Sequence, residues 1–254
     1  MIDWLIQQRS DLPAVAPDLW LSVPERDRMR TLRMEKRREE WLIGRWTARR
    51  LIQAWAQREL GFAPHPTELM ILPAPDGAPE IHALDPALRM ALGTVRLTIS
   101  HSVGQAFCAL APAGAPVGAD IEQIAPRHSN FAETYYTPGE IALLEATAPT
   151  HYNLLLNAIW STKEAVLKAL RHGLRVDTRL VECLVPLPDA TDQEADWRPF
   201  LAHCDPSLGA PPAGVRCWWR QDHNVVLTIA AITPRLVTEQ VGNRPVIQSP
   251  LYGR

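Results

Sequence analysis

The feature that most constrains the fold is the order of two hydrophobic periodicities along the chain. Apolar residues recur at helical spacing within 35–60 and 151–171, and the runs between and after these segments are strand-like. The predicted strands are 68–73, 95–100, 106–111, 116–121, 181–187, 215–220 and 225–232. The first four are expected to form one small, mainly antiparallel sheet and the last three a second sheet. The order helix, sheet, helix, sheet predicts an α+β fold with two halves.

Capping signals mark where the helices begin and end. Residues 22–25 and 137–140 both have capping-box spacing, with a proline early in the first turn. Gly61 and Gly173 follow the two long periodic segments, as glycines at helix C-termini do. The first signal predicts a helix that runs through a basic segment to Lys36, and the second predicts a short helix.

Composition excludes several classes of protein. The 26 Lys and Arg residues nearly balance the 28 Asp and Glu residues, which argues against a protein that coats nucleic acid or binds membrane surfaces. No apolar run approaches the roughly 20 residues that a membrane-spanning helix needs, and the N-terminus lacks a signal-peptide pattern. The four cysteines form no C-x-x-C pair, so neither a zinc site nor a disulfide framework is indicated. A cytoplasmic protein without nucleic-acid or membrane partners is expected.

Two carboxylates interrupt the apolar run at 116–124. Asp120 and Glu122 are two positions apart, so on a strand their side chains point to the same face. Like charges at this separation repel each other, and the pair therefore needs a counter-charge or a bound cation.

The helix predicted at 151–171 carries polar groups in unusual places. Its apolar stripe consists of Leu155, Ile159, Val166 and Leu170. Trp160, Glu164 and Lys168 fall four apart on a neighbouring face, which by itself fits an ordinary salt bridge beside a packed indole. Lys163 lies within the apolar stripe, where it must reach solvent or find an anionic partner.

The acidic residues of the strand and of the helix can converge on one divalent cation. Three carboxylates, from Asp120, Glu122 and Glu164, suit magnesium, which keeps waters and takes further ligands from substrate phosphates. An incomplete protein shell implies a substrate that bears phosphate. Lysines near Glu164 would then stabilise phosphate charge or a leaving group.

At these residues the sequence resembles a known family. The segment VGADIE followed by WSTKEAVLKA resembles the paired signature of 4'-phosphopantetheinyl transferases. Ser100-His101-Ser102 matches a third element of that family, and the stretch from Gly44-Arg45 to Arg49 matches a fourth, weaker one. The chain length resembles the larger, pseudo-dimeric class, in which two similar α+β halves hold the site between them.

The resemblance implies a division of labour between two halves. Residues 1–114 would supply contacts to the nucleotide of coenzyme A, and residues 115–254 would supply the magnesium ligands and catalytic residues. A short internal match, Leu-Thr-Ile at 97–99 and again at 227–229, is consistent with a repeat.

The resemblance also implies a reaction. Members of the holo-[acyl-carrier-protein] synthase type transfer the phosphopantetheine arm of coenzyme A to a serine hydroxyl of an acyl, peptidyl or aryl carrier protein and release adenosine 3',5'-bisphosphate. By this analogy Asp120, Glu122 and Glu164 bind Mg²⁺, Glu164 also deprotonates the serine, and Lys168 stabilises the leaving phosphate.

Further residues inherit roles in binding coenzyme A. Ser100 and His101 would read its 3'-phosphate, and Lys163 would contact phosphate as well. In the mixed-charge segment 26–50, Arg45 would approach the nucleotide phosphates, whereas Arg49 is expected to be structural. In the family a basic residue commonly stands between the glycine and proline of 77–79, but this chain has alanine there, so that contact is missing.

The partners are expected to be coenzyme A and a carrier protein, with the chain itself a monomer. Carrier domains are usually acidic, so a basic or apolar docking surface is predicted at 127–136, where Phe131→Ala or Tyr135→Ala would weaken carrier binding. Residues 237–254 carry no assignable motif and could form a tail or a partner contact.

Two other functions stay open. A non-catalytic relative of the same fold would bind coenzyme A or a protein without transfer. A magnesium-dependent hydrolase of nucleotide pyrophosphates would use the same acids without a protein acceptor. The sequence does not indicate which carrier protein or pathway is served.

Overall fold

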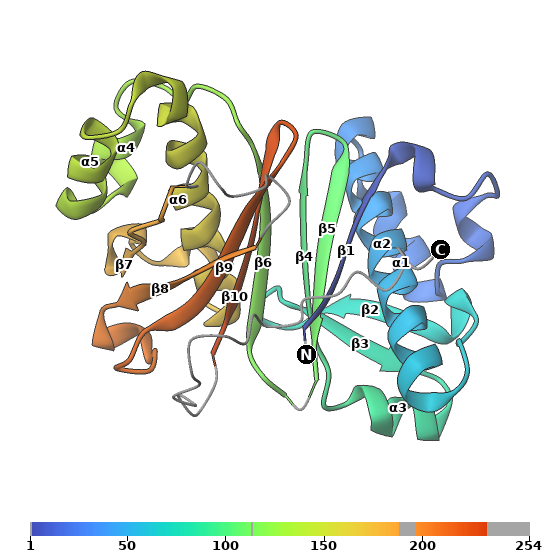
Figure 1. Ribbon diagram of the computed structural model, residues 1–254. Helices are drawn as coiled ribbons and strands as arrows, with labels where there is room; N and C mark the ends of the chain where they lie inside the picture. Colours follow the sequence, from blue (N-terminus) through green and yellow to red (C-terminus); the bar gives the residue numbers. More distant parts are fainter. Residues whose placement is uncertain (1, 113, 188–196, 233–254) are drawn as a thin grey trace. The chain divides into compact units, whose positions relative to one another are not determined.

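The chain folds into two compact α+β units, which meet in sequence between Ala115 and Pro116 (Figure 1). The computed structural model describes residues 2–112, 114–187 and 197–232. We call the part before this division unit 1 and the part from Pro116 onward unit 2. The predicted α+β class is confirmed, whereas residues 237–254 lie outside the described residues.

Unit 1 is built around one long helix and a three-stranded sheet. Its elements are β1 (Asp3–Gln8), α1 (Val23–Thr31), α2 (Glu35–Leu60), β2 (Leu69–Pro73), β3 (Pro79–Ala83), α3 (Pro86–Leu92), β4 (Arg96–Ser102) and β5 (Gln105–Ala111). The sheet is antiparallel in the order β1-β5-β4, and β2 and β3 form a separate hairpin. Helix α2 packs on β5, β1 and β4, which buries its apolar side against the sheet.

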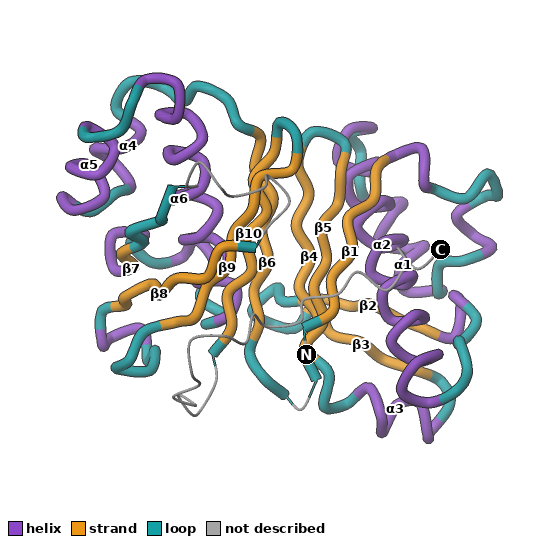
Figure 2. The backbone as a smooth tube through the Cα atoms, viewed as in Figure 1, coloured by secondary structure: helices purple, strands orange, loops and turns teal. Residues whose placement is uncertain are grey.

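Unit 2 repeats this plan with a wider sheet. Its elements are β6 (Val117–Gln123), α4 (Phe131–Tyr135), α5 (Pro138–Glu145), α6 (Pro149–Ala169), β7 (Val181–Glu182), β8 (Arg198–Cys204), β9 (Val215–Asp222) and β10 (Val225–Ala231). The sheet order is β6-β10-β9-β8-β7, again antiparallel (Figure 2). Helix α6 packs on β6 and β10, and Leu155, Ile159 and Val166 of its predicted stripe are fully buried.

Most of the predicted helix-capping signals are confirmed. Both capping boxes are present, at Ser22 and at Thr137, and Gly61 adopts the left-handed conformation with φ 81° at the end of α2. The predicted helix from Ser22 to Lys36 is instead two helices, because Leu32 and Met34 have extended backbones between α1 and α2.

The predicted first sheet was wrong in its composition. Its four strands are distributed over three sheets: β2 pairs with β3, β4 and β5 pair with β1, and β6 pairs with β10 in unit 2. Strands β1, β3 and β8 were missed because DWLIQQ, PEIHA and RPFLAHC mix charged, amide or proline residues into short segments. No described helix has the length and apolar character needed to cross a membrane.

The two units share one topology. In each unit the first strand is followed by a long helix, and the last two strands form a hairpin whose final strand pairs with the first. These elements are β1, α2, β4 and β5 in unit 1, and β6, α6, β9 and β10 in unit 2. The Leu-Thr-Ile match does not mark this repeat, since 97–99 lies in β4 and 227–229 in β10, which are not equivalent strands. The two units are therefore related by their topology and not by the Leu-Thr-Ile match.

Candidate active site

Gly118 sets the distance between β6 and α6. A Cβ at this position would lie 1.8 Å from the carbonyl oxygen of Ala165 and 2.7 Å from the amide nitrogen of Ala169, so only glycine fits. Side chains two apart on a strand share a face, and Asp120 and Glu122 therefore face α6 as Gly118 does. The close approach brings the acidic strand against the helix that carries the third carboxylate.

Lys168 joins two of the three carboxylates. Its Nζ lies 2.6 Å from Oδ1 of Asp120 and 3.5 Å from Oε2 of Glu164, and it also donates to the carbonyl of Ala119. Asp120 is 2% exposed, and the Lys168 side chain is partly buried. The predicted pairing of Glu164 with Lys168 along the helix is confirmed.

Glu122 has different partners. The indole Nε1 of Trp160 donates to its Oε1 at 3.1 Å, and Nη2 of Arg127 donates to its Oε2 at 2.8 Å. Arg127 was missed as a site residue, because it lies in the loop after β6 and belongs to no matched motif. Its position five residues after Glu122 gives no periodic signal.

Burial and repulsion from neighbouring acids raise the pKa values of Glu164 and Glu122. Burial is the main cause for Glu164, whose pKa rises to about 7, with Asp120 adding to the effect and Lys168 opposing it. Burial and then Asp120 raise the pKa of Glu122, against the opposing effect of Arg127. Burial alone would lower the pKa of Lys168, but Asp120 and Glu164 outweigh it and the pKa is raised. The cluster thus combines three mutually repelling acids with two cations.

The donor set fits a hard divalent cation. In the ranges 2–112, 114–187 and 197–232 no three His, Cys, Asp or Glu side chains are grouped in a metal-binding arrangement, and here the carboxylates are held by Lys168 and Arg127. Carboxylate oxygens are nevertheless the ligands that Mg²⁺ prefers, and three acids against two cations leave negative charge for a cation to neutralise. The residues present are therefore compatible with the predicted ion.

Lys163 does not occupy a position from which it could contact phosphate. Its side chain is 0% exposed and its Nζ lies 2.8 Å from Oε2 of Glu140, with further bonds to the carbonyls of Thr178 and Val181. The predicted phosphate contact is corrected: the lysine has found the anionic partner that its place in the apolar stripe requires.

Unit 1 contains the counterpart of this buried pair. Glu25 of the first capping box binds Arg49 of α2, which is also 0% exposed and donates to the carbonyls of Pro66 and Leu69. In both units the acid is the third residue of a capped helix and the cation comes from the long helix. The expected structural role of Arg49 is confirmed, and Lys163 has the same role.

Lys163→Met is expected to lower the free energy of unfolding by about 3–5 kcal/mol, because it leaves Glu140 charged and buried without its cation. The double variant Lys163→Met/Glu140→Gln should recover part of this loss, because it removes the unpaired buried charge. The recovery is incomplete, since Thr137 and Cys183 donate to different oxygens of Glu140 and the amide of glutamine has only one. Denaturant unfolding measures both.

Arg30→Met is the control for this substitution, because Arg30 is exposed and pairs with Asp27 at the surface, so the fall in unfolding free energy should be small. A Lys163→Met variant as stable as the wild type, but with weakened binding of coenzyme A, would restore the phosphate assignment.

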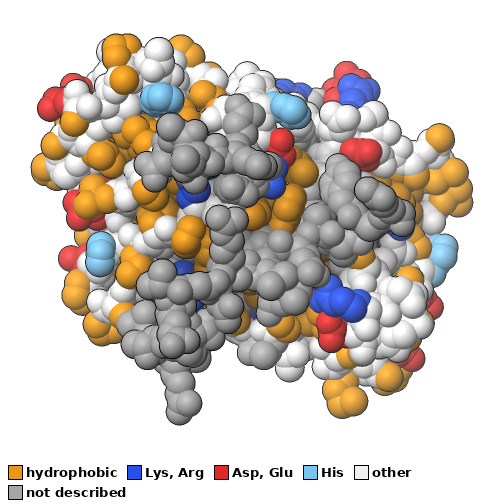
Figure 3. All heavy atoms as spheres, viewed as in Figure 1, with side chains coloured by type: hydrophobic (Ala, Val, Ile, Leu, Met, Phe, Trp, Pro, Cys, Tyr) orange, Lys and Arg blue, Asp and Glu red, His pale blue; other side chains and the backbone are white. Residues whose placement is uncertain are grey.

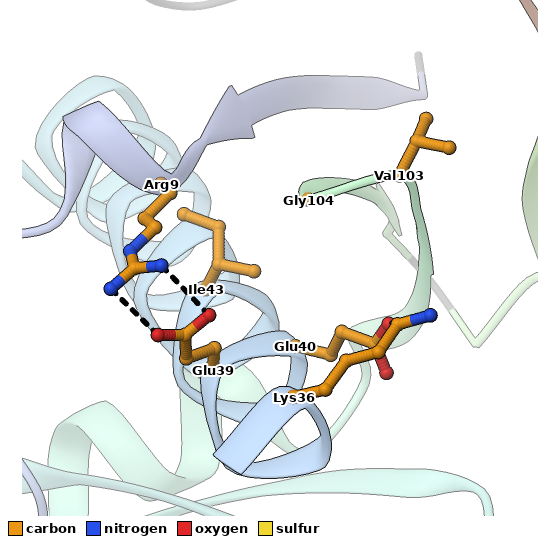
Figure 4. A pocket seen from close by; sticks show the side chains of 7 residues that line it. All are labelled: Arg9, Lys36, Glu39, Glu40, Ile43, Val103 and Gly104. Atoms are coloured by element: carbon orange, nitrogen blue, oxygen red, sulfur yellow. Dashed lines mark hydrogen bonds and ion pairs between the residues drawn. The ribbon is translucent and has the colours of Figure 1, made fainter.

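Unit 1 has a pocket of about 260 Å³ beside the turn after β4 (Figure 4). Its lining residues are Arg9, Lys36, Glu39, Glu40, Ile43, Val103 and Gly104. Figure 4 shows Arg9 and Glu39 facing each other, and the ion pair between them measures 2.6 Å. Sequence reasoning did not single out Arg9 or Lys36, the two cations of this pocket.

Ser100 and His101 lie in β4, just before this turn. Nδ1 of His101 is 3.9 Å from Oε2 of Glu40, which lines the pocket, and Ser100 is buried.

Arg45 is placed elsewhere: its Nε lies 3.8 Å from Oε1 of Glu25 and its guanidinium lies over the Trp41 ring. Burial lowers the pKa of Arg45 to about 10, partly opposed by Glu25.

The comparisons with known proteins agree with the motifs of unit 2. The ACPS family model, described as the 4'-phosphopantetheinyl transferase superfamily, matches residues 116–226. A 4'-phosphopantetheinyl transferase of Bacillus subtilis is 32% identical over 84 residues, which cover 33% of this chain and 37% of that relative.

Solved structures of similar proteins include two acyl-carrier-protein synthases. The Chronobacterium ammoniagenes ACPS–CoA complex is 24% identical, covers 44% of this chain and 96% of that chain, and has a TM-score of 0.34. The Thermotoga maritima holo-[acyl-carrier-protein] synthase is 14% identical, covers 53% and 73%, and has a TM-score of 0.35.

The matched range contains Asp120, Glu122, Glu164 and Lys168, the residues that the fold of unit 2 gathers between β6 and α6. The sequence motifs, the family model and the curated relative agree that unit 2 is similar to proteins of the 4'-phosphopantetheinyl transferase superfamily.

Proposed function

We propose that the chain transfers the 4'-phosphopantetheine group of coenzyme A to a serine hydroxyl of a carrier protein and releases adenosine 3',5'-bisphosphate. The observation that supports this most strongly is the meeting of Asp120, Glu164 and Lys168 at one point between β6 and α6. An acid that can accept a proton and a fixed ammonium beside it are the two side-chain functions that phosphoryl transfer requires.

The proposed transfer forms one bond to phosphorus and breaks another. The serine oxygen bonds to the phosphorus that carries pantetheine, and the bond from that phosphorus to the oxygen of the departing bisphosphate breaks. Glu164 takes the serine proton, and the ammonium of Lys168 offsets the charge on the departing phosphate. Asp120, Glu122 and Glu164 would hold a magnesium ion, which supplies charge neutralisation at the pyrophosphate.

The pocket of unit 1 fits a role in binding the nucleotide end of coenzyme A. His101 and Ser100 lie next to its Val103–Gly104 turn, and Arg9 and Lys36 bring positive charge to its lining. A 3'-phosphate would be recognised by such cations and by hydroxyl donors. In this assignment Arg45 contributes through the packing around Glu25, and its direct contact with coenzyme A is not required.

Intact-mass spectrometry of a carrier protein tests the function directly. After incubation with this protein, coenzyme A and Mg²⁺, the carrier should gain the mass of one phosphopantetheine, and EDTA should prevent the gain. If several carriers gain no mass while coenzyme A still binds, the non-catalytic alternative replaces this proposal. Release of phosphate products from coenzyme A without any carrier would favour the hydrolase.

A carrier protein is expected to dock at α4, and Tyr135 is the residue that tests this. The rings of Phe131 and Tyr135 both pack on Trp160, but Phe131 is 6% exposed whereas Tyr135 is only partly buried, so Phe131→Ala would disturb the core more. On the face drawn in Figure 3, hydrophobic side chains are numerous over the α4–α5 part of unit 2.

Tyr135→Ala is expected to weaken carrier binding roughly tenfold, as loss of an aromatic anchor commonly does, and to leave coenzyme A affinity unchanged. Surface plasmon resonance with an immobilised apo-carrier measures the first, and calorimetry measures the second. The exposed Tyr152 of α6 provides the matched control. Unchanged carrier affinity in Tyr135→Ala would place docking on another surface.

A further inference from the structure

Glu122 is held differently from the other two carboxylates of the site, which pair with Lys168. Both of its oxygens accept a hydrogen bond from a fixed donor, Oε1 from Trp160 and Oε2 from Arg127. These donors come from different elements, one from α6 and one from the loop after β6. Two donors on two different oxygens restrict the torsions of the glutamate to one orientation.

Arg127 is itself held in place. Its Nε donates to Oδ1 of Asn157 at 2.8 Å while Nη2 reaches Glu122, so the guanidinium uses two of its donors in fixed directions. Its guanidinium carbon also lies 5.1 Å over the ring of Phe131, which packs against the ring of Trp160. The side chain is therefore not a loose surface partner of Glu122.

Asn157 anchors this arrangement to α6. It is fully buried, and its Nδ2 donates to the carbonyls of Ala125 and Asn153. Because Ala125 belongs to the loop that follows β6, Asn157 ties the loop to the helix and presents Oδ1 to Arg127. Both ends of the Asn157 amide are thus occupied, which fixes the direction from which it holds the guanidinium.

We propose that Arg127 and Trp160 are positioning residues that hold Glu122 in the orientation in which it binds the divalent cation. This rests on the proposed function, because it assumes that Glu122 is a ligand. A carboxylate free to rotate would lose conformational entropy on binding a cation, whereas a carboxylate already held by two donors loses little. Outer partners of metal ligands typically contribute 10–100-fold to metal affinity.

Two conservative substitutions remove the positioning without changing charge. Trp160→Phe keeps an aromatic ring but loses the Nε1 donor. Arg127→Lys keeps the positive charge but cannot reach Glu122 and Asn157 together, since an ammonium lacks the planar fork. Because neither variant alters the net charge of the site, a loss of cation affinity reports geometry alone.

The test is calorimetric titration of the metal-free protein with Mg²⁺, and with Mn²⁺ as a second probe, in the absence of coenzyme A. Each variant is expected to raise the Kd by about tenfold or more. The controls are the same two substitutions at positions away from Glu122. Arg179→Lys changes an arginine that pairs with Asp177 on the surface, and Trp219→Phe removes an indole that donates to the carbonyl of Pro186. Both controls should match the wild type.

A Kd within about twofold of wild type in Arg127→Lys or in Trp160→Phe overturns the assignment of that residue. Thermal unfolding of each variant shows whether a loss of affinity comes from unfolding. A double-mutant cycle with Glu122→Ala tests whether Arg127 acts through Glu122. In a protein that lacks Glu122, Arg127→Lys should have no further effect on the Kd for Mg²⁺. A persisting effect would mean that Arg127 does not act through Glu122.

Asp120→Asn and Glu164→Gln in the same titration separate this inference from the proposed function. If these two variants bind Mg²⁺ as the wild type does, the metal site itself is wrong. If they lose affinity and Arg127→Lys and Trp160→Phe do not, the site stands and only the positioning role fails.

Discussion

Asp120→Asn is expected to lower the rate of phosphopantetheine transfer by at least about 10³-fold while the fold stays intact. The substitution removes one of three carboxylates at the site, and charge neutralisation by a bound metal ion contributes several kcal/mol to phosphoryl transfer. Asparagine has nearly the same shape as aspartate, and its Oδ1 can still accept the hydrogen bond from Lys168. The fall in rate is measured by carrier mass shift over time, at saturating coenzyme A.

Asp177→Asn is the matched control, because Asp177 belongs to the same unit but pairs with Arg179 at the surface. Its transfer rate should equal that of the wild type. Circular dichroism and thermal unfolding establish that both variants fold. Transfer by Asp120→Asn at more than about one tenth of the wild-type rate would remove Asp120 from the magnesium assignment.

The acid pair and its helix partner could be predicted because each relation is local. Asp120 and Glu122 share a face through the two-residue repeat of a strand, and Glu164 and Lys168 meet through the turn of a helix. The structure confirms both relations. The motifs then indicated that the strand and the helix lie together, which periodicity alone cannot establish.

The partners of Lys163 and Glu122 could not be predicted, because they are set by tertiary packing. The helical wheel showed that Lys163 needed an anion, but nothing in the sequence identified Glu140, whose capping-box role is local and is normally exposed. Arg127 lies in an irregular loop whose path depends on Asn157. A family motif containing Lys163 therefore led to a phosphate contact that burial excludes.

The repeated topology provides an internal comparison for the site. The two units can be aligned from the turns of their β4–β5 and β9–β10 hairpins. In this alignment Leu5 of β1 stands at the position of Asp120 in β6, and Gln7 stands at the position of Glu122. Unit 1 therefore builds the equivalent strand without either carboxylate. The fold does not require acids at these positions, which supports a chemical role for the two acids in unit 2.

The helices differ in the same way. If Arg49 and Lys163 are equivalent, Arg50 stands where unit 2 has Glu164, and Ala54 stands where it has Lys168. Unit 1 has kept the buried ion pair that stabilises the repeat but has neither the acid nor the lysine of the site at these positions. Stability and chemistry are thus carried by different residues of the same long helix.

Gly118→Ala is expected to lower the free energy of unfolding by about 3 kcal/mol or more, because the added Cβ would collide with backbone atoms of α6 that no rotamer change can move. At the equivalent register position of β1 stands Asp3, whose carboxylate pairs with Arg58, so the topology alone does not impose the close approach. Relief of the collision requires β6 and α6 to separate. That movement would also draw Asp120 away from Lys168.

The matched control is Gly44→Ala, the same substitution at the contact of α2 with β4. Its Cβ would lie 3.1 Å from a methyl group of Ile99, which can shift, and alanine favours the helix by about 1 kcal/mol. Its stability should therefore stay close to that of the wild type. Denaturant unfolding compares the two variants, and transfer is measured where Gly118→Ala is still folded. A loss below about 1 kcal/mol in Gly118→Ala would mean that β6 and α6 tolerate a wider spacing and that glycine does not fix the site.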